Sequence, residues 1–178
     1  YPFGRQGPAP GELVSVADGI SWTRSPVPGS LSHINLWLID EAEGFAIVDS
    51  GLAIAAARQA WETLFEGPLA GRRASRLIIL LLSVGFAALL WDEESIAAEA
   101  ARGGGRFASV VSEIPSSYVR LRDGDEIILG GRAWRIVVGC GHSPEHACLW
   151  DLERNILIAG DQVLPRITSN VSLSMSEP

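Results

Sequence analysis

An uncharged apolar stretch of fifteen residues, from Leu77 to Trp91, most constrains what this chain can fold into, because so long an apolar run has to be buried. A membrane-spanning helix needs roughly 20 apolar residues, and this run is shorter and contains Gly85. Globular-looking segments rather than basic flanks surround it, so we do not expect a membrane span. Two interpretations stay open. The stretch is either one continuous buried helix or strand, or a strand that ends near Leu80 and is followed directly by a different, helical segment. We favour the second.

Composition limits the class of protein. A chain of 178 residues can form a single domain with a substantial core, and 47% hydrophobic with 20% charged residues is typical of soluble globular proteins. The net charge of −7 argues against nucleic acid and against anionic membranes as partners. The partner that we expect is a small-molecule substrate. The first residues show no basic stretch followed by an apolar one, so we expect no signal peptide and a cytoplasmic location.

Two cysteines, Cys140 and Cys148, are too few for a disulfide scaffold, and their spacing does not match a zinc knuckle. We expect both to be buried thiols of the core. Redox chemistry at this pair is a weaker option, because it would need a basic neighbour that lowers a thiol pKa, and the sequence shows none.

The order of predicted elements is rich in β-strands, with helices between hairpins. Alternating or continuous apolar segments are separated by turn signals such as "DG" and "GG". Apolar residues at helical spacing, followed by "GPL", predict a helix that ends there. Such a pattern favours helices layered on sheets. The expected hairpins cover residues 12–27, 33–51, 118–139 and 146–161, the expected helices 54–69 and 92–105, and a buried strand 76–80.

Two loops that follow apolar strands offer side chains suited to metal binding. In "RIVVGCGHSPEH" the strand ends in glycines and His142 follows, and in "NILIAGDQVL" Asp161 follows a strand and a glycine. Imidazole and carboxylate groups at strand ends are the ligands that a hard or borderline divalent metal takes. Taken singly, a histidine in the position of His142 is more often structural or solvated, and an aspartate in the position of Asp161 more often forms a turn.

A third strand end, "FAIVDSG", carries Asp49 before Gly51. The triplet "DSG" also occurs in aspartic proteases, but that chemistry needs two carboxylates that share a proton, and only one copy is present. The other interpretation of Asp49 is a side chain that forms a turn leading into the helix expected at residue 54.

Together these segments resemble the metallo-β-lactamase superfamily, and its glyoxalase II-like metallohydrolases in particular. The resemblance runs in order from "GISWTRSPVPGSLSHINLWLID" and "GFAIVDSG", through "DGDEIILGGRAWRIVVG" and "GHSPEH", to "IAGDQVLPRITSNVSL". It implies an α/β fold of the αββα sandwich type with one or two divalent metals along one sheet edge. It also implies that His142 is a metal ligand, that Asp161 is the carboxylate that bridges two metals, and that Asp49 lies beside the ligands without binding metal.

The family's main signature, His-x-His-x-Asp-His after a strand like "RLIIL", is absent. The chain has three histidines, and none lies between residues 34 and 141. Four ligands are therefore missing, and a later family histidine also has no counterpart. This absence supports the second interpretation of the apolar stretch. We expect residues 1–178 to be a single, incomplete domain that lacks a loop of a few dozen residues near 80–82 and a C-terminal part.

The resemblance implies a metal-dependent hydrolase that cleaves ester, thioester, lactam or phosphoester bonds by means of metal-bound hydroxide. Zinc is the expected metal, and iron or manganese also suit these ligands. The alternative is a non-catalytic, metal-free member of the fold that acts as a binding or interaction module. It applies if the chain is complete as given, because two ligands cannot hold a catalytic metal tightly. No side chain is assigned a catalytic role, and the substrate and the oligomeric state stay open.

Overall fold

The structure of the protein is a computed structural model that describes residues 7–29, 32–80, 117–140 and 145–163. The chain divides into two compact units. The described residues up to Ile79 belong to the first unit, and Leu80 belongs to the second together with the described residues from 117 onward.

The first unit is built on a five-stranded sheet in the order β1-β2-β3-β4-β5. Neighbouring strands from β1 to β4 are antiparallel, whereas β4 and β5 are parallel. The hairpins expected over 12–27 and 33–51 are confirmed, because both chain reversals fall at the turns that the sequence predicts. The strands are β1 (Val14–Ala17), β2 (Ile20–Pro26), β3 (His33–Glu41), β4 (Gly44–Val48) and β5 (Ala74–Ile78).

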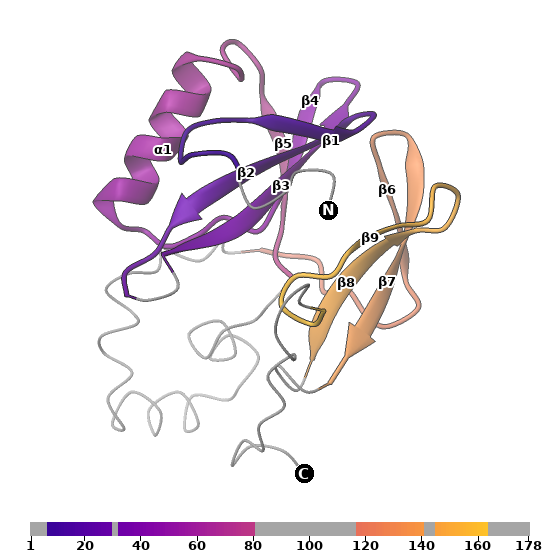
Figure 1. Cartoon of the computed structure of the whole chain (residues 1–178). Helices are drawn as coiled ribbons and strands as arrows, with labels where there is room; N and C mark the ends of the chain where they lie inside the picture. The colour runs from indigo at the N-terminus through magenta and orange to yellow at the C-terminus, as the bar shows by residue number, and fades with distance from the viewer. Residues whose placement is uncertain (1–6, 30–31, 81–116, 141–144, 164–178) are drawn as a thin grey trace. The chain divides into compact units, whose positions relative to one another are not determined.

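Helix α1 (Ala55–Glu66) connects the parallel strands β4 and β5, and Figure 1 shows it lying along one face of the sheet. Its apolar side packs into a core cluster that contains Leu38 of β3, Phe45 of β4 and Leu64 of the helix, each at most 2% exposed. Burying a side chain such as Leu64 contributes roughly 1.5–3 kcal/mol, so this contact fixes the helix on the sheet. The loop between β4 and α1 is thereby held at the end of β4.

The described part of the apolar stretch is the end of a strand. Ile78 and Leu80 are buried, although Leu77 is 51% exposed. Residues 81–91, the helix expected at 92–105 and all but the first residue of the 80–82 region lie outside the described residues. Within the described ranges, no helix has both the length and the apolar character needed to cross a lipid bilayer.

The second unit contains a four-stranded antiparallel sheet in which the strands pair in chain order. The hairpin expected over 146–161 is confirmed, whereas in the range 118–139 only the part from Glu126 onward forms a hairpin. One face is a core with Trp134, Ile136 and Leu149 fully buried. The strands are β6 (Glu126–Leu129), β7 (Arg132–Gly139), β8 (His146–Asp151) and β9 (Ile156–Ile158).

The opposite face of this sheet carries apolar side chains that remain exposed. Ile128 on β6 is 55% exposed, Leu152 just after β8 is 43% exposed, and Leu157 on β9 is 48% exposed. The strand register places Ile128 and Leu157 on the same face as the half-buried Trp150, and Leu152 follows in the turn after β8. We call Ile128, Trp150, Leu152 and Leu157 the open face of the second sheet.

Candidate functional site

Strands β7 and β9 end at the same edge of the second sheet. Both pair antiparallel with β8, which lies between them, so they run parallel to each other. Asp161 follows β9 in a tight turn and is partly exposed, and the preceding Gly160 has a φ of +51°. The chain that leaves β7 and the loop that carries Asp161 therefore meet at one edge.

His142 lies outside the described residues, so its own position is not part of the geometry. Cys140, two residues earlier in the chain, is described. The carbonyl of Cys140 accepts a hydrogen bond of 3.1 Å from the side-chain amide of Gln162, the residue after Asp161. The loop that begins at Cys140 is thus joined directly to the loop of Asp161.

His146, the first residue of β8, is a second link at this edge. Its side chain is 1% exposed, and Nε2 lies 3.1 Å from the carbonyl oxygen of Ala159. A carbonyl can only accept, so Nε2 carries the proton in this contact. A side chain at Gly160 would overlap the imidazole ring, so this glycine lets the turn close onto His146.

Sequence analysis did not single out His146 or Gln162. Two sequence features point to these residues: the second histidine in "GHSPEH" and the amide side chain directly after Asp161 in "GDQ".

Leu80 also reaches this edge. Its carbonyl oxygen accepts a hydrogen bond of 3.0 Å from the backbone N–H of Ala147, the residue after His146. Because Ala147 pairs with Val138 near the end of β7, Leu80 lies next to the strand ends that lead to His142 and Asp161. The missing loop is expected near residues 80–82, so the first residue of that region lies beside the candidate site.

Asp49 lies in the first unit, directly after β4. It is partly buried, and its backbone N–H donates a 2.8 Å hydrogen bond to the carbonyl of Ile78 on β5. Its φ of +60° lies in the left-handed region, which is uncommon outside glycine although Asp tolerates it better than most residues. Such strained positions cluster at functional sites.

The loop of Asp49 is held by its neighbours. Gly51 has a φ of +82°, and a side chain there would overlap the hydroxyl of Ser25, which is buried on β2. The indole of Trp61 donates to the carbonyl of Ser50 at 3.2 Å. The predicted arrangement of Asp49 beside the metal ligands stays a prediction.

Within the part of the chain that the structure describes, no three His, Cys, Asp or Glu side chains gather closely enough to hold a metal ion. Asp161 is the one predicted metal ligand among those residues. Its partly exposed carboxylate fits the oxygen-donor role that the family resemblance gives it.

The cysteine prediction is half wrong. Cys148 is buried as expected, but Cys140 is exposed, because it follows the last residue of β7 where the chain leaves the sheet. Burial raises the pKa of the Cys148 thiol, which disfavours the thiolate that redox chemistry requires.

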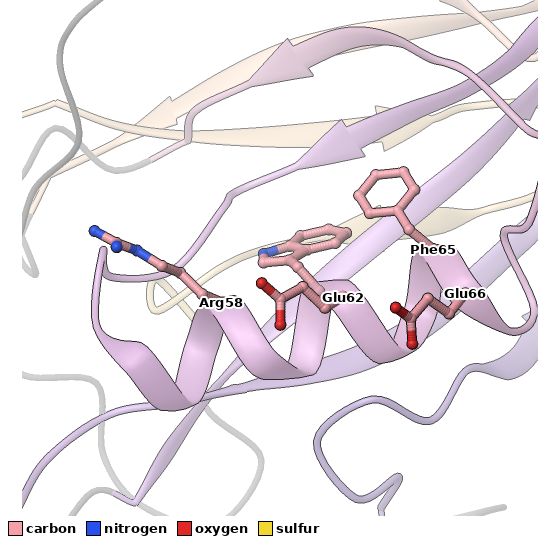
Figure 2. A pocket seen from close by; sticks show the side chains of 5 residues that line it. Arg58, Glu62, Phe65 and Glu66 are labelled. Atoms are coloured by element: carbon pink, nitrogen blue, oxygen red, sulfur yellow. The ribbon is translucent and has the colours of Figure 1, made fainter.

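A shallow depression lies elsewhere, on helix α1. Figure 2 shows side chains that line it, among them the charged Arg58, Glu62 and Glu66 and the aromatic Phe65, all from this one helix. Trp61 completes it, with its ring 5.9 Å from that of Phe65. It contains none of the residues that the sequence predicts as functional.

Comparison with known proteins identifies solved structures that are similar to this chain. A beta-lactamase domain protein from Burkholderia ambifaria is 37% identical, with a TM-score of 0.80 over 99% of this chain and 64% of that one. A metallo-beta-lactamase family protein from Thermus thermophilus is 25% identical, with a TM-score of 0.74 over 89% of this chain and 64% of that one. The predicted fold, an αββα sandwich of the metallo-β-lactamase type, is confirmed by these likenesses.

Curated relatives include acyl-coenzyme A thioesterase MBLAC2 from Bos taurus, 29% identical, and from Homo sapiens, 28% identical. Each match covers 84% of this chain and 65% of the relative, so this chain spans about two thirds of their length. The match extends over 184 positions, but 84% of 178 residues is about 150. About 34 positions of the bovine alignment therefore fall opposite gaps in this chain.

The family model described as the metallo-beta-lactamase superfamily matches residues 29–176. That range covers most of the chain and includes the segments of Asp49, His142 and Asp161. The chain belongs to the metallo-β-lactamase superfamily.

Proposed function

We propose that this chain derives from a metal-dependent hydrolase of the glyoxalase II-like group, in which His142 and Asp161 hold a divalent metal, most simply zinc. One observation carries the proposal. The loop after β7, the loop of Asp161 and the chain at Leu80 all reach one edge of the second sheet, through the Gln162–Cys140 and Ala147–Leu80 hydrogen bonds. Convergence of several chain segments at a strand-end edge is the arrangement that a metal site needs.

The metal, when bound, would activate water near neutral pH and polarise the bond under attack. The residues of the chain itself would bind the metal or hold its ligands in place. Asp161 supplies an anionic oxygen ligand, and His146 holds the turn before it by its hydrogen bond to Ala159. Asp49, on a strained backbone at the end of β4, would support the site without binding metal itself.

The proposed substrate is a small acyl thioester. The support is the similarity to the bovine and human relatives, which are named acyl-coenzyme A thioesterases. Esters, lactams and phosphoesters are attacked by the same chemistry and are the competing substrate classes. A cytoplasmic location belongs to the same proposal, because free thiols at Cys140 and Cys148 suit a reducing compartment.

A second candidate function is a metal-free binding or interaction module. It is favoured by the shortage of ligands, since three histidines in the whole chain cannot supply the His-x-His-x-Asp-His signature in addition to His142. For the hydrolase, we propose that the segment of about 34 positions that the bovine relative has and this chain lacks belongs directly after Leu80. That segment would contain the signature.

Hydrolysis assays on two proteins distinguish the two functions. The first protein is the chain itself, and the second carries the bovine relative's corresponding segment inserted after Leu80. Both are incubated with zinc and a panel of one acyl thioester, one ester, one lactam and one phosphodiester. We expect thioester hydrolysis by the second protein, and its loss in the same protein with Asp161→Asn.

Inactivity of the inserted protein towards all four classes, with zinc bound at Asp161, would overturn the hydrolase proposal and leave the binding module. Activity that survives Asp161→Asn would remove that residue from the site. Equal activity of the chain without insertion would show that the missing segment is dispensable.

A further inference from the structure

One end of the first sheet carries aromatic and polar side chains on the face opposite α1. Side chains alternate along a strand, so every second residue of β2 and β3 lies on this face. Leu38, which packs in the core cluster under α1, belongs to the other face. The register between β2 and β3 pairs Trp22 with Trp37 and Arg24 with Asn35. These four side chains are therefore neighbours on one face of the sheet.

The side chain of Arg24 is held in place by its neighbours. The indole of Trp22 stacks on that of Trp37, with ring centroids 6.1 Å apart, and its N–H donates a 2.9 Å hydrogen bond to the side chain of Asn35. The guanidinium carbon of Arg24 lies 4.9 Å from the centroid of the Trp22 ring, which is a cation–π contact. A side chain at Gly7 would overlap the guanidinium, so the backbone packs against it as well.

The positive charge of Arg24 is not neutralised within the described part of the chain. No Asp or Glu there forms an ion pair with it, although acidic residues outnumber basic ones by 21 to 14 in the whole chain. Its Nε is buried and has no hydrogen-bond partner among these residues. Buried donors in folded proteins nearly always have a partner, so a fixed guanidinium without one indicates a role outside the fold itself.

His33 adds a second nitrogen group beside this guanidinium. It pairs with Pro26 in the register, which places it on the same face as Arg24. Burial and the charge of Arg24 lower the pKa of His33, whereas a nearby carboxylate would raise it. The hydroxyl of Ser32 lies 2.9 Å from Nδ1 of His33 and offers a further polar contact. The surroundings of Arg24 and His33 are therefore positive.

We propose that Arg24 and His33 form a binding site for a phosphate group of the substrate. Arginine suits phosphate because its planar guanidinium presents N–H groups to two oxygens at once. The site lies at the edge of the first sheet where Asp49 follows β4, since Val48, the last residue of β4, pairs with Trp37.

The identity of the ligand rests on the proposed function, in which the substrate is an acyl thioester. A phosphate site at this edge would select thioesters whose thiol carries phosphates, as that of coenzyme A does. The binding itself requires no metal, because every group that we assign to the site belongs to β2, β3 or the residue before β3.

The test is a titration of the ¹⁵N-labelled chain, without added metal, with three probes: coenzyme A, pantetheine and inorganic phosphate. We expect coenzyme A to shift the indole N–H signal of Trp22 and the backbone signals of Arg24 and His33. Pantetheine, which has the same thiol but no phosphate, should leave them unchanged, and inorganic phosphate should shift them only at higher concentration. Arg24→Gln should raise the Kd for coenzyme A about tenfold, because it removes charged hydrogen bonds to the phosphate.

The matched control is Arg73→Gln, which removes an exposed arginine next to β5, at the opposite end of the sheet from Asp49, and should bind as the wild type does. Arg24→Lys keeps the charge without the planar group and should give an intermediate Kd, and Tm shows whether each variant is folded. An unchanged Kd in folded Arg24→Gln or Arg24→Lys, or equal shifts with pantetheine, would overturn the phosphate site.

Two further outcomes separate this inference from the proposed function. Equal Kd values for inorganic phosphate and coenzyme A would overturn the assignment to the substrate, because the site would then take free phosphate. Binding of coenzyme A at Arg24, together with failure of the hydrolysis assays described above, would overturn the proposed hydrolase and support the phosphate site.

Discussion

The strained backbone at the end of β4 shows how single residues fix the loop of Asp49. Gly51→Ala should destabilise the protein by about 1–3 kcal/mol, because it combines a left-handed backbone with overlap of the Ser25 hydroxyl. Urea unfolding measures the change. Gly29→Ala is the control, since Gly29 has a φ of +88° but no atom within 4 Å of the added carbon. An equal loss in both variants would mean that contact with Ser25 is irrelevant.

Asp151 gives the second residue-scale prediction. Burial would raise its pKa, but hydrogen bonds and charge from Arg154, with the N–H of Glu153, hold the pKa of this carboxyl below its usual range. Its contribution to stability is therefore present above the unfolded pKa of about 3.9 and is lost as pH falls through the lower folded value. Asp151→Asn should cost about 3 kcal/mol at pH 7, and the difference from wild type should shrink below pH 4.

The control for that comparison is Asp40→Asn, which breaks the exposed 2.5 Å pair with Arg72. Exposed pairs contribute about 0–1 kcal/mol, so this variant should change little at either pH. Unfolding curves at pH 7 and pH 3 are the measurement. A difference between wild type and Asp151→Asn that stays constant over this range would show that the ion pair with Arg154 does not stabilise the fold.

The roles of individual residues in the candidate site were the hardest feature to predict from the sequence. Asp161 could be proposed because a carboxylate follows an apolar strand and a glycine. Gln162 and His146 could not, because their roles depend on contacts between β7, β8 and β9 that no local pattern encodes. Cys140 was wrongly placed in the core, because it lies one residue beyond the end of β7, where the chain leaves the sheet.

Helix α1 supports a prediction at the scale of an element. Leu64 is 1% exposed within the core cluster, whereas Phe65 beside it is 41% exposed. Leu64→Ala should destabilise the protein by about 2–5 kcal/mol, and Phe65→Ala by much less. Thermal and urea unfolding give both values. Equal losses would mean that the depression around Phe65 contributes to stability as much as the face of α1 that is buried on the sheet.

Most elements could be predicted from sequence, for physical reasons. The hairpins β1–β2, β3–β4 and β6–β7 have turn residues between apolar strands, and α1 has helical spacing that ends at Gly67. The parallel pairing of β4 with β5 could not be read from local pattern, because it depends on how α1 packs. Residues 118–122 were expected to be a strand but are irregular, since the turn at Arg122–Asp125 begins there.

At the scale of the whole molecule, the open face of the second sheet is the feature least expected of a soluble protein. Ile128 and Leu157 are each about half exposed on a face that is usually polar in antiparallel sheets. The double variant Ile128→Thr/Leu157→Thr should raise solubility and lower binding of a hydrophobic fluorescent dye, with little change in Tm. Dye binding equal to that of the wild type would show that this face is not where the dye adsorbs.

The chain-order pairing of β6, β7, β8 and β9 affects the order in which the strands form during folding. Neighbouring strands in this meander are joined by connections of at most six residues, whereas β5 can pair with β4 only after α1 has crossed between them. Short loops cost little entropy to close, so contacts of low sequence separation form first. In pulse-labelled hydrogen exchange during refolding, the amides of β7 and β8 should gain protection before those of β5. If β5 gained protection first, the crossover rather than the meander would nucleate folding.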